Sequence, residues 1–179
     1  RVWFDTNDNG QINAGEVGIN NVSVSLFASG NLTTALQTTT TDASGYYRFD
    51  NVVAGSYVIR INPSNFASGG ALAGYRNTTG NVAANVDSTA TLAGEDGINP
   101  SGAANTILTN GILSNVKTIA ANTTAEPTGE TDVQASGQGT ADNQANMTID
   151  FGFYKLNLSG TVWNDTGAGG NNNNGILDA

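Results

Sequence analysis

The chain contains no cysteine and no histidine, and each absence removes whole classes of chemistry. Without cysteine there are no disulfides, no thiolate metal sites and no thiol nucleophile. Without histidine there is no Ser-His-Asp triad, no imidazole general base and no usual zinc site. Carboxylates are the one remaining route to acid–base chemistry, and we find neither a nucleophile–base pair nor a cofactor motif. We therefore expect a protein that is not an enzyme.

Positive charge and long apolar runs are also scarce. Six Lys and Arg stand against 15 Asp and Glu, which gives a net charge of −9. No basic patch can collect phosphates, so we expect neither nucleic acid nor anionic lipid as a partner. No apolar run approaches the roughly 20 residues needed to cross a bilayer, so we expect no membrane insertion. The chain lacks an initial Met and a signal peptide, which indicates an excerpt of a longer protein.

Gly, Asn, Thr, Ser and Ala dominate the composition, while charged residues make up only 12%. This balance is common in secreted β-proteins and unlike that of helical proteins. Apolar residues recur at every second position in residues 22–27, 57–61 and 147–154, as in half-buried strands of an antiparallel sheet. No stretch of ten or more residues has a helical repeat with caps. The sequence therefore predicts an exported, all-β protein.

Two further features complete the prediction of secondary structure. Residues 36–41 and 46–50 flank Asp42-Ala43-Ser44-Gly45, a short connection that predicts a hairpin. Residues 64–145 carry weak strand signals only at 105–109 and 115–119, so we expect a few short strands joined by long surface loops. For residues 127–144, order and disorder remain equally open because the stretch has little apolar material.

An internal repeat sets the domain organisation. Val2-Trp3-Phe4-Asp5-Thr6 recurs as Val162-Trp163-Asn164-Asp165-Thr166, and the Asn- and Gly-rich residues 7–14 recur as 172–179. Solenoid repeats are only about 20–50 residues long, so a repeat of this length indicates a tandem array of whole domains. We predict one repeat domain over residues 1–156. Residues 157–179 would be a linker followed by the first strand and loop of the next repeat.

Residues 5–16 fit the twelve-residue calcium loop D-x-[DN]-x-[DN]-G-x5-E at every specified position. In such loops oxygens at this spacing converge on one hard cation, and Gly10 permits the sharp turn. The segments on either side read as strand edges and not as the helices of a calcium sensor. With only two charged ligand positions, we expect an affinity of about 10⁻⁴ to 10⁻³ M. The predicted ligands are Asp5, Asn7, Asn9, the carbonyl of Gln11, Asn13 directly or through water, and Glu16.

A second, incomplete site is expected in the second copy of the loop. There the counterpart of Glu16 would fall beyond Ala179. For both copies the alternative is an Asn-, Asp- and Gly-rich turn that binds no metal. The predicted ligands of the second copy are Asp165, Asn172, Asn174 and Asp178.

The motifs at both ends of residues 1–156 resemble the SdrD B-like repeats of bacterial surface proteins, which are relatives of the Cna B-type domains. The resemblance rests on Val2-Trp3-x-Asp5-x-Asn7-x-Asn9-Gly10, on Gly15-Glu16-x-Gly18-Ile19 and on Asp150-Phe151-Gly152-Phe153-Tyr154. It implies a Greek-key, immunoglobulin-like or prealbumin-like β-sandwich with calcium in its loops. Related Cna B-type domains form Lys–Asn crosslinks. Lys117 and Lys155 are the only lysines here and neither lies in the expected first strand, so we expect no such crosslink.

These observations leave two functional hypotheses. The first is a structural repeat of a secreted bacterial surface protein, stiffened by calcium and partnered by neighbouring copies, either as a stalk spacer or as a subunit of an extracellular filament. The second is an adhesin module that binds a protein, glycan or surface ligand through exposed loops in residues 64–145. The sequence does not decide between stalk and filament, nor does it identify a ligand or the number of calcium sites.

Overall fold

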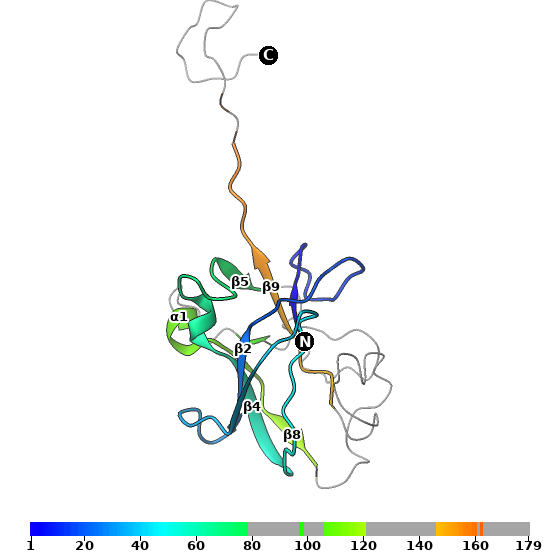
Figure 1. The fold of residues 1–179 in the computed structure, drawn as a ribbon, viewed down its shortest axis with the longest axis vertical. Helices are drawn as coiled ribbons and strands as arrows, with labels where there is room; N and C mark the ends of the chain where they lie inside the picture. Colours follow the sequence, from blue (N-terminus) through cyan, green and yellow to red (C-terminus); the bar gives the residue numbers. More distant parts are fainter. Residues whose placement is uncertain (79–96, 99–105, 121–145, 161, 163–179) are drawn as a thin grey trace, which may run out of the picture.

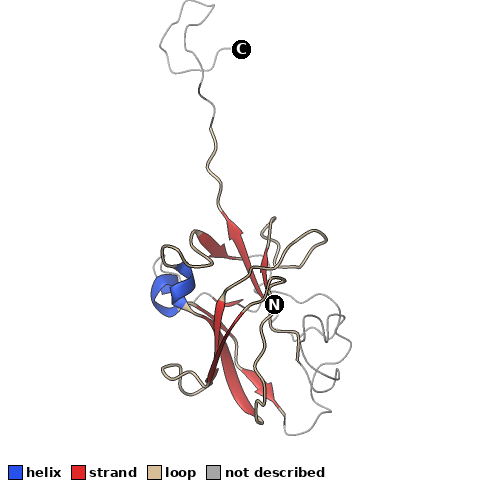
Figure 2. Cartoon of the chain, viewed as in Figure 1, coloured by secondary structure: helices blue, strands red, loops and turns tan. Residues whose placement is uncertain are grey.

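The computed structural model describes residues 1–78, 97–98, 106–120, 146–160 and 162, and nearly all regular structure in them is β (Figures 1 and 2). The predicted all-β class is confirmed. The only helical segments among these residues are two short turns, η1 (Pro63–Phe66) and α1 (Thr106–Asn110). The strands are β1 (Val2–Phe4), β2 (Ser23–Ala28), β3 (Gln37–Thr40), β4 (Gly55–Ile61), β5 (Tyr75–Asn77), β6 (Gly97–Ile98), β7 (Ile112–Ser114), β8 (Lys117–Ile119) and β9 (Phe151–Lys155).

The strands form two sheets that pack against each other as a β-sandwich. One sheet has the order β1-β9-β5, with β1 parallel and β5 antiparallel to β9. The other has the order β3-β2-β4-β7-β6, and β8 also pairs with β4. All pairings of the larger sheet are antiparallel. The parallel pair joins segments from opposite ends of the domain, because Val2 lies opposite Phe151 and Phe4 opposite Phe153.

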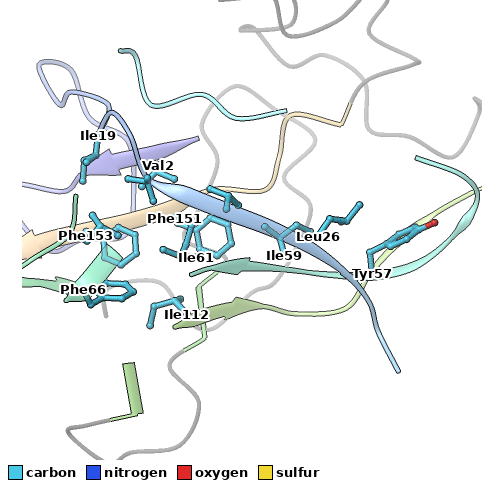
Figure 3. Packing of buried hydrophobic residues seen from close by; sticks show 13 residues of the cluster. Val2, Ile19, Leu26, Tyr57, Ile59, Ile61, Phe66, Ile112, Phe151 and Phe153 are labelled. Carbon is cyan, nitrogen blue, oxygen red and sulfur yellow. The ribbon is translucent and has the colours of Figure 1, made fainter. Parts of the chain in front are cut away.

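The core lies between the two sheets and follows the period-two pattern of the strands (Figure 3). Leu26 of β2 lies opposite Ile59 of β4, and from β9 Phe151 lies beside Ile61 and Phe153 beside Phe66. Burying each such side chain stabilises the fold by about 1.5–3 kcal/mol. The buried residues of this cluster are Val2, Ile19, Val22, Val24, Leu26, Tyr57, Ile59, Ile61, Phe66, Leu72, Ile112, Phe151 and Phe153.

The outer face of β2 and β4 is covered too, which the alternating pattern did not predict. Phe27 is only 1% exposed, and the guanidinium of Arg60 lies over its ring, 4.2 Å from the centre. Arg60 also donates a hydrogen bond to the carbonyl of Leu32 at 3.3 Å. Partial burial lowers the pKa of Arg60, since removal from water disfavours the charged guanidinium. These two strands are therefore buried on both faces.

The predicted hairpin at Asp42 is wrong, although its turn forms. The Asp42 carboxylate accepts hydrogen bonds from the backbone N–H groups of Ser44 and Tyr46, and Gly45 takes a φ of 81°. Residues 46–50 are not a strand, and β3 pairs with β2 instead. The segment makes a tertiary contact instead, because the Tyr47 hydroxyl donates to the carbonyl of Ile149, just before β9 in the other sheet.

The strand predicted at residues 147–154 exists but begins later, as β9. The side chain of Asn146 accepts hydrogen bonds from the backbone N–H and the hydroxyl of Thr148, and this local turn replaces strand pairing there. Ile149 is only partly buried against the core, whereas Phe151 and Phe153 are fully buried.

The strand predicted at residues 105–109 is wrong, because residues 106–110 form α1. This helix ends at Gly111, whose φ of 71° suits a helix C-terminus and whose N–H donates to the carbonyl of Ile107. The strand predicted at 115–119 is confirmed for its second half, as β8. The open question about residues 127–144 lies outside the described residues. Within the described ranges no helix has the length and apolar character needed to cross a membrane.

After β9 the chain leaves the sandwich as an extended segment, at the end of the molecule where the loop after β1 lies (Figure 1). Its apolar side chains are exposed: Leu156 by 64%, Leu158 by 101% and Val162 by 98%. The domain boundary that we place at residue 156 remains a prediction. Residues 163–179 lie outside the described residues, and with them the second-copy ligands Asp165, Asn172, Asn174 and Asp178.

Candidate metal centre

The loop of residues 5–16 begins directly after β1 and returns the chain alongside it. The N–H of Phe4 donates to the carbonyl of Val17 at 2.9 Å, and Trp3 forms an antiparallel bridge with Gly18. The N–H of Asp5 donates to the carbonyl of Phe153 at 2.9 Å, which ties the start of the loop to β9. Both ends of the loop are thus held by backbone pairing, and no helix of a sensor type flanks it in the described structure.

Asp5, the first predicted ligand, is fully buried at the centre of the loop. Its Oδ2 atom accepts hydrogen bonds from the N–H of Gly10 at 2.8 Å and from the hydroxyl of Thr78 at 2.9 Å. Its Oδ1 atom accepts longer contacts of 3.3 Å from the N–H groups of Asn7 and Asn9. The loop therefore wraps around the Asp5 carboxylate, and the φ of 73° at Gly10 allows the turn that the motif requires.

Three side-chain amides gather beside Asp5. The Oδ1 atom of Asn13 accepts hydrogen bonds from the amide nitrogens of Asn7 at 3.1 Å and Asn9 at 2.8 Å. The Oδ1 atom of Asn9 in turn accepts from the N–H of Gln11 at 2.9 Å. A half-turn of an amide group exchanges its nitrogen with its oxygen. The same three side chains can therefore bond to one another or present oxygens to a cation between them.

Glu16 closes the loop at its far end and is only 9% exposed. Its Oε1 atom accepts from the N–H of Thr6 at 2.8 Å and from the Thr6 hydroxyl at 3.0 Å. Its Oε2 atom accepts from the N–H of Asn13 at 2.9 Å. The Glu16 carboxylate thus joins Thr6, near the start of the loop, to Asn13, near its end.

The chemistry of these donors fits calcium. Asp5 and Glu16 are two buried carboxylates of the same loop, and neither has a Lys or Arg partner in the part of the chain that the structure describes. Hydrogen bonds from the loop offset part of the cost of burying these two charges, and a bound cation would offset more of it. Calcium prefers oxygen ligands from carboxylates, amides and backbone carbonyls. The described residues contain no group of three or more acidic, His or Cys side chains, so neutral amides supply most of the candidate ligands.

The structure thus brings together five of the six ligands predicted for the first copy, namely Asp5, Asn7, Asn9, Asn13 and Glu16. The sixth, Gln11, is exposed and takes part in the hydrogen bonding of the loop through its backbone N–H.

Sequence reasoning missed two hydroxyl groups that hold the carboxylates. Thr6 stands at a position that the motif leaves unspecified, so only the structure reveals its bond to Glu16. Thr78 is 73 residues from its partner Asp5 and carries no local signal.

Comparisons with known proteins identify a family for this chain. The model of the SdrD B-like domain family matches residues 1–112, which contain the whole loop. Serine-aspartate repeat-containing protein F of Staphylococcus epidermidis is 33% identical over 181 aligned residues, covering 99% of this chain and 8% of that protein. Colossin-B of Dictyostelium discoideum is 43% identical over 67 residues, covering 34% of this chain and 2% of that protein. A fibrinogen-binding protein of Staphylococcus epidermidis is 42% identical over 62 residues, covering 34% of this chain and 5% of that protein. The chain spans less than a tenth of each of these relatives.

Proposed function

The chain belongs to the SdrD B-like domain family, and on that premise we propose that it is a calcium-stabilised structural module of a bacterial cell-surface protein. In this proposal the module lies outside the cell, repeats along a stalk and holds calcium as a structural ion whose occupancy is set by the external calcium concentration. No catalytic role is included, because no nucleophile–base pair can be assembled from the residues.

One observation carries the calcium proposal: the loop that matches the calcium motif holds the buried carboxylates of Asp5 and Glu16 without a basic partner among the described residues. A divalent cation would neutralise both charges and replace the amide contacts of Asn7, Asn9 and Asn13. Because the unfolded chain has no preformed site, binding would stabilise the folded state, by about 2.7 kcal/mol at a calcium concentration 100 times the Kd.

The arrangement of β1 and β9 supports a stalk role. In a tandem array the preceding segment joins β1 and the following segment joins β9. The two strands are parallel neighbours, so tension along the array pulls them past each other in shear. Their hydrogen bonds then share the load instead of opening one after another. The candidate metal loop starts where this pair ends, with the N–H of Asp5 on the carbonyl of Phe153.

The exit segment supports a tandem arrangement. Leu156 and Leu158 are exposed on the chain that leads into the second copy of the Val-Trp motif, and so is Val162, the first residue of that copy. Exposed apolar side chains in a row are typical of a surface that a partner covers. In this proposal the partner is the next repeat, packed near the metal loop.

A ligand-binding adhesin module is the second candidate. It is favoured by the similarity to a protein named for fibrinogen binding. That match covers only 34% of this chain and 5% of the relative, so the named activity and the matched segment need not coincide. We therefore place this candidate second.

Isothermal titration calorimetry of the purified chain with calcium tests the main proposal. We expect saturable binding in the range of about 10⁻⁴ to 10⁻³ M, strongly reduced by Asp5→Ala. A flat titration at millimolar calcium, with a protein shown to be free of metal beforehand, would contradict it. Saturable binding of fibrinogen to the isolated chain would instead favour the adhesin candidate.

A further inference from the structure

A residue outside the loop of residues 5–16, Thr78, also binds the Asp5 carboxylate. Thr78 follows directly after β5 and is only 1% exposed. Its hydroxyl donates to Oδ2 of Asp5 at 2.9 Å. This bond joins the loop that follows the first strand to a residue 73 positions later in the chain.

The position of Thr78 is set by the sheet and not by the loop. The N–H of Thr78 donates to the carbonyl of Gly152 at 3.0 Å, on one side of β9. The N–H of Asp5 donates to the carbonyl of Phe153 on the other side of the same strand. The carbonyls of two neighbouring residues of β9 therefore fix the backbone positions of Thr78 and Asp5, and the side chains of these two residues meet.

The two oxygens of Asp5 differ in how firmly they are held. Oδ2 accepts two short hydrogen bonds, at 2.8 Å from Gly10 and 2.9 Å from Thr78. From the described residues, Oδ1 accepts only two contacts of 3.3 Å, both from backbone N–H groups of the loop. Hydrogen bonds of 2.8–2.9 Å to a carboxylate are strong, as at Oδ2, whereas contacts of 3.3 Å, as at Oδ1, are weak. Oδ1 is thus the oxygen left free to bind a cation.

We infer that Thr78 is a positioning residue of the candidate calcium centre, and this inference rests on the function proposed above. Its hydroxyl fixes the rotation of the Asp5 carboxylate, so that Oδ2 stays with the protein and Oδ1 faces the loop interior before the metal arrives. Groups that hold a ligand in this way commonly affect metal affinity by about 10- to 100-fold when they are removed. Thr78 is not itself a ligand in this scheme.

Three substitutions test this role. Thr78→Val keeps the shape of the side chain and removes the donor, whereas Thr78→Ser keeps the donor. Thr41→Val is the matched control, because Thr41 is also buried at 3% exposure and hydrogen-bonded, with its hydroxyl donating to Ile19 and accepting from Val22. Calcium affinity of each protein is measured by calorimetry, and exchange of the Gly10 amide is measured by NMR in chelator.

We expect Thr78→Val to weaken calcium binding by about 10- to 100-fold and Thr78→Ser to bind as the original chain does. Thr41→Val is expected to lower the melting temperature without changing the affinity. In the metal-free protein, Thr78→Val alone should speed exchange of the Gly10 amide, because its acceptor Asp5 becomes free to rotate.

The outcomes separate this inference from the proposed function. If the unaltered chain binds calcium and Thr78→Val binds equally well, the positioning role is wrong while the calcium proposal stands. If the unaltered chain does not bind calcium, both are wrong. Should Thr78→Val fail to fold, Thr78→Ser decides the question, since a loss of affinity as large as that of Asp5→Asn would overturn the role of the hydroxyl.

Discussion

Phe4 lies directly opposite Phe153 in the parallel pair of β1 and β9, and the next residue, Asp5, donates its N–H to the Phe153 carbonyl at 2.9 Å. The aromatic core and the candidate metal loop therefore meet on one pair of strands. A change that orders the loop therefore also holds the end of the β1–β9 pair. A change that loosens the core at Phe153 displaces Asp5, the first predicted ligand.

Chelation of calcium is expected to lower the melting temperature, and substitutions of the two loop carboxylates should abolish that response. Calcium at 100 times its Kd adds about 2.7 kcal/mol, which for a chain of this size corresponds to about 5–10 °C. In Asp5→Asn and Glu16→Gln we expect the melting curves with calcium and with chelator to coincide, because each change removes one of the two formal charges of the site. Differential scanning calorimetry measures this.

Asp50→Asn is the control for the carboxylate substitutions. Its side chain is 61% exposed and pairs with Arg48 on the surface, away from the loop. An exposed pair contributes about 0–1 kcal/mol, so the response to calcium should be retained in full. If Asp50→Asn and Asp5→Asn lose the calcium response equally, the net charge of the protein, and not the loop, governs the shift in melting temperature.

Gly10→Ala is expected to destabilise the domain and to weaken the loop. The φ of 73° at this position costs an L-residue with a side chain about 1–2 kcal/mol. The displaced backbone would also withdraw the N–H that holds Oδ2 of Asp5. Gly30→Ala is the matched control, because a Cβ there meets no atom within 4 Å. Urea denaturation of both variants measures the difference, and equal stabilities would contradict the strained turn.

The geometry of the loop over residues 5–16 could be predicted because it depends on local sequence, whereas calcium binding there stays a prediction. The spacing of Asp5 to Glu16 predicts the turn at Gly10, and in the structure the N–H of Gly10 reaches Asp5 while the side chains of Asn9 and Asn13 meet. Core positions such as Leu26 and Ile59 followed from the period of two, since one face of a strand must be apolar.

Features that depend on distant partners were not predictable in this way. Tyr47 lies outside the expected hairpin, and its hydroxyl donates to the carbonyl of Ile149, 102 residues later. Thr78 bonds to Asp5 although 73 residues separate them, and no sequence pattern predicts this contact of one hydroxyl group. In α1, the β-branched Thr106 and Ile107 favour a strand on intrinsic preference, yet the segment forms a helical turn ended by Gly111.

Phe153→Ala is expected to cost about 3–5 kcal/mol of unfolding free energy, because it empties a fully buried site that packs against Phe66 at a ring distance of 5.7 Å. Since Phe153 also accepts the N–H of Asp5 through its backbone, the variant should bind calcium more weakly if it folds. Val17→Ala is the control: Val17 adjoins the loop but is 61% exposed, so its loss should change stability by less than about 0.5 kcal/mol. Chemical denaturation in chelator and in calcium gives both quantities, and a cost below 1 kcal/mol for Phe153→Ala would contradict the packing described.

Substitution of the exposed leucines of the exit segment should affect neighbouring repeats but not the single domain. Leu156 and Leu158 are 64% and 101% exposed, so replacing both by Asn should change the stability of the present chain by less than about 0.5 kcal/mol. In a protein of two consecutive repeats the same change should widen the distribution of angles between domains, because the apolar contact with the next copy is lost. Small-angle scattering with calcium present measures that distribution. Val53→Asn, at 73% exposure on the loop before β4, is the control and should leave the angles unchanged. Identical scattering from the leucine variant and the control would show that the exit segment does not pack against the following repeat, and the stiffness of a stalk would then have to come from the metal loop.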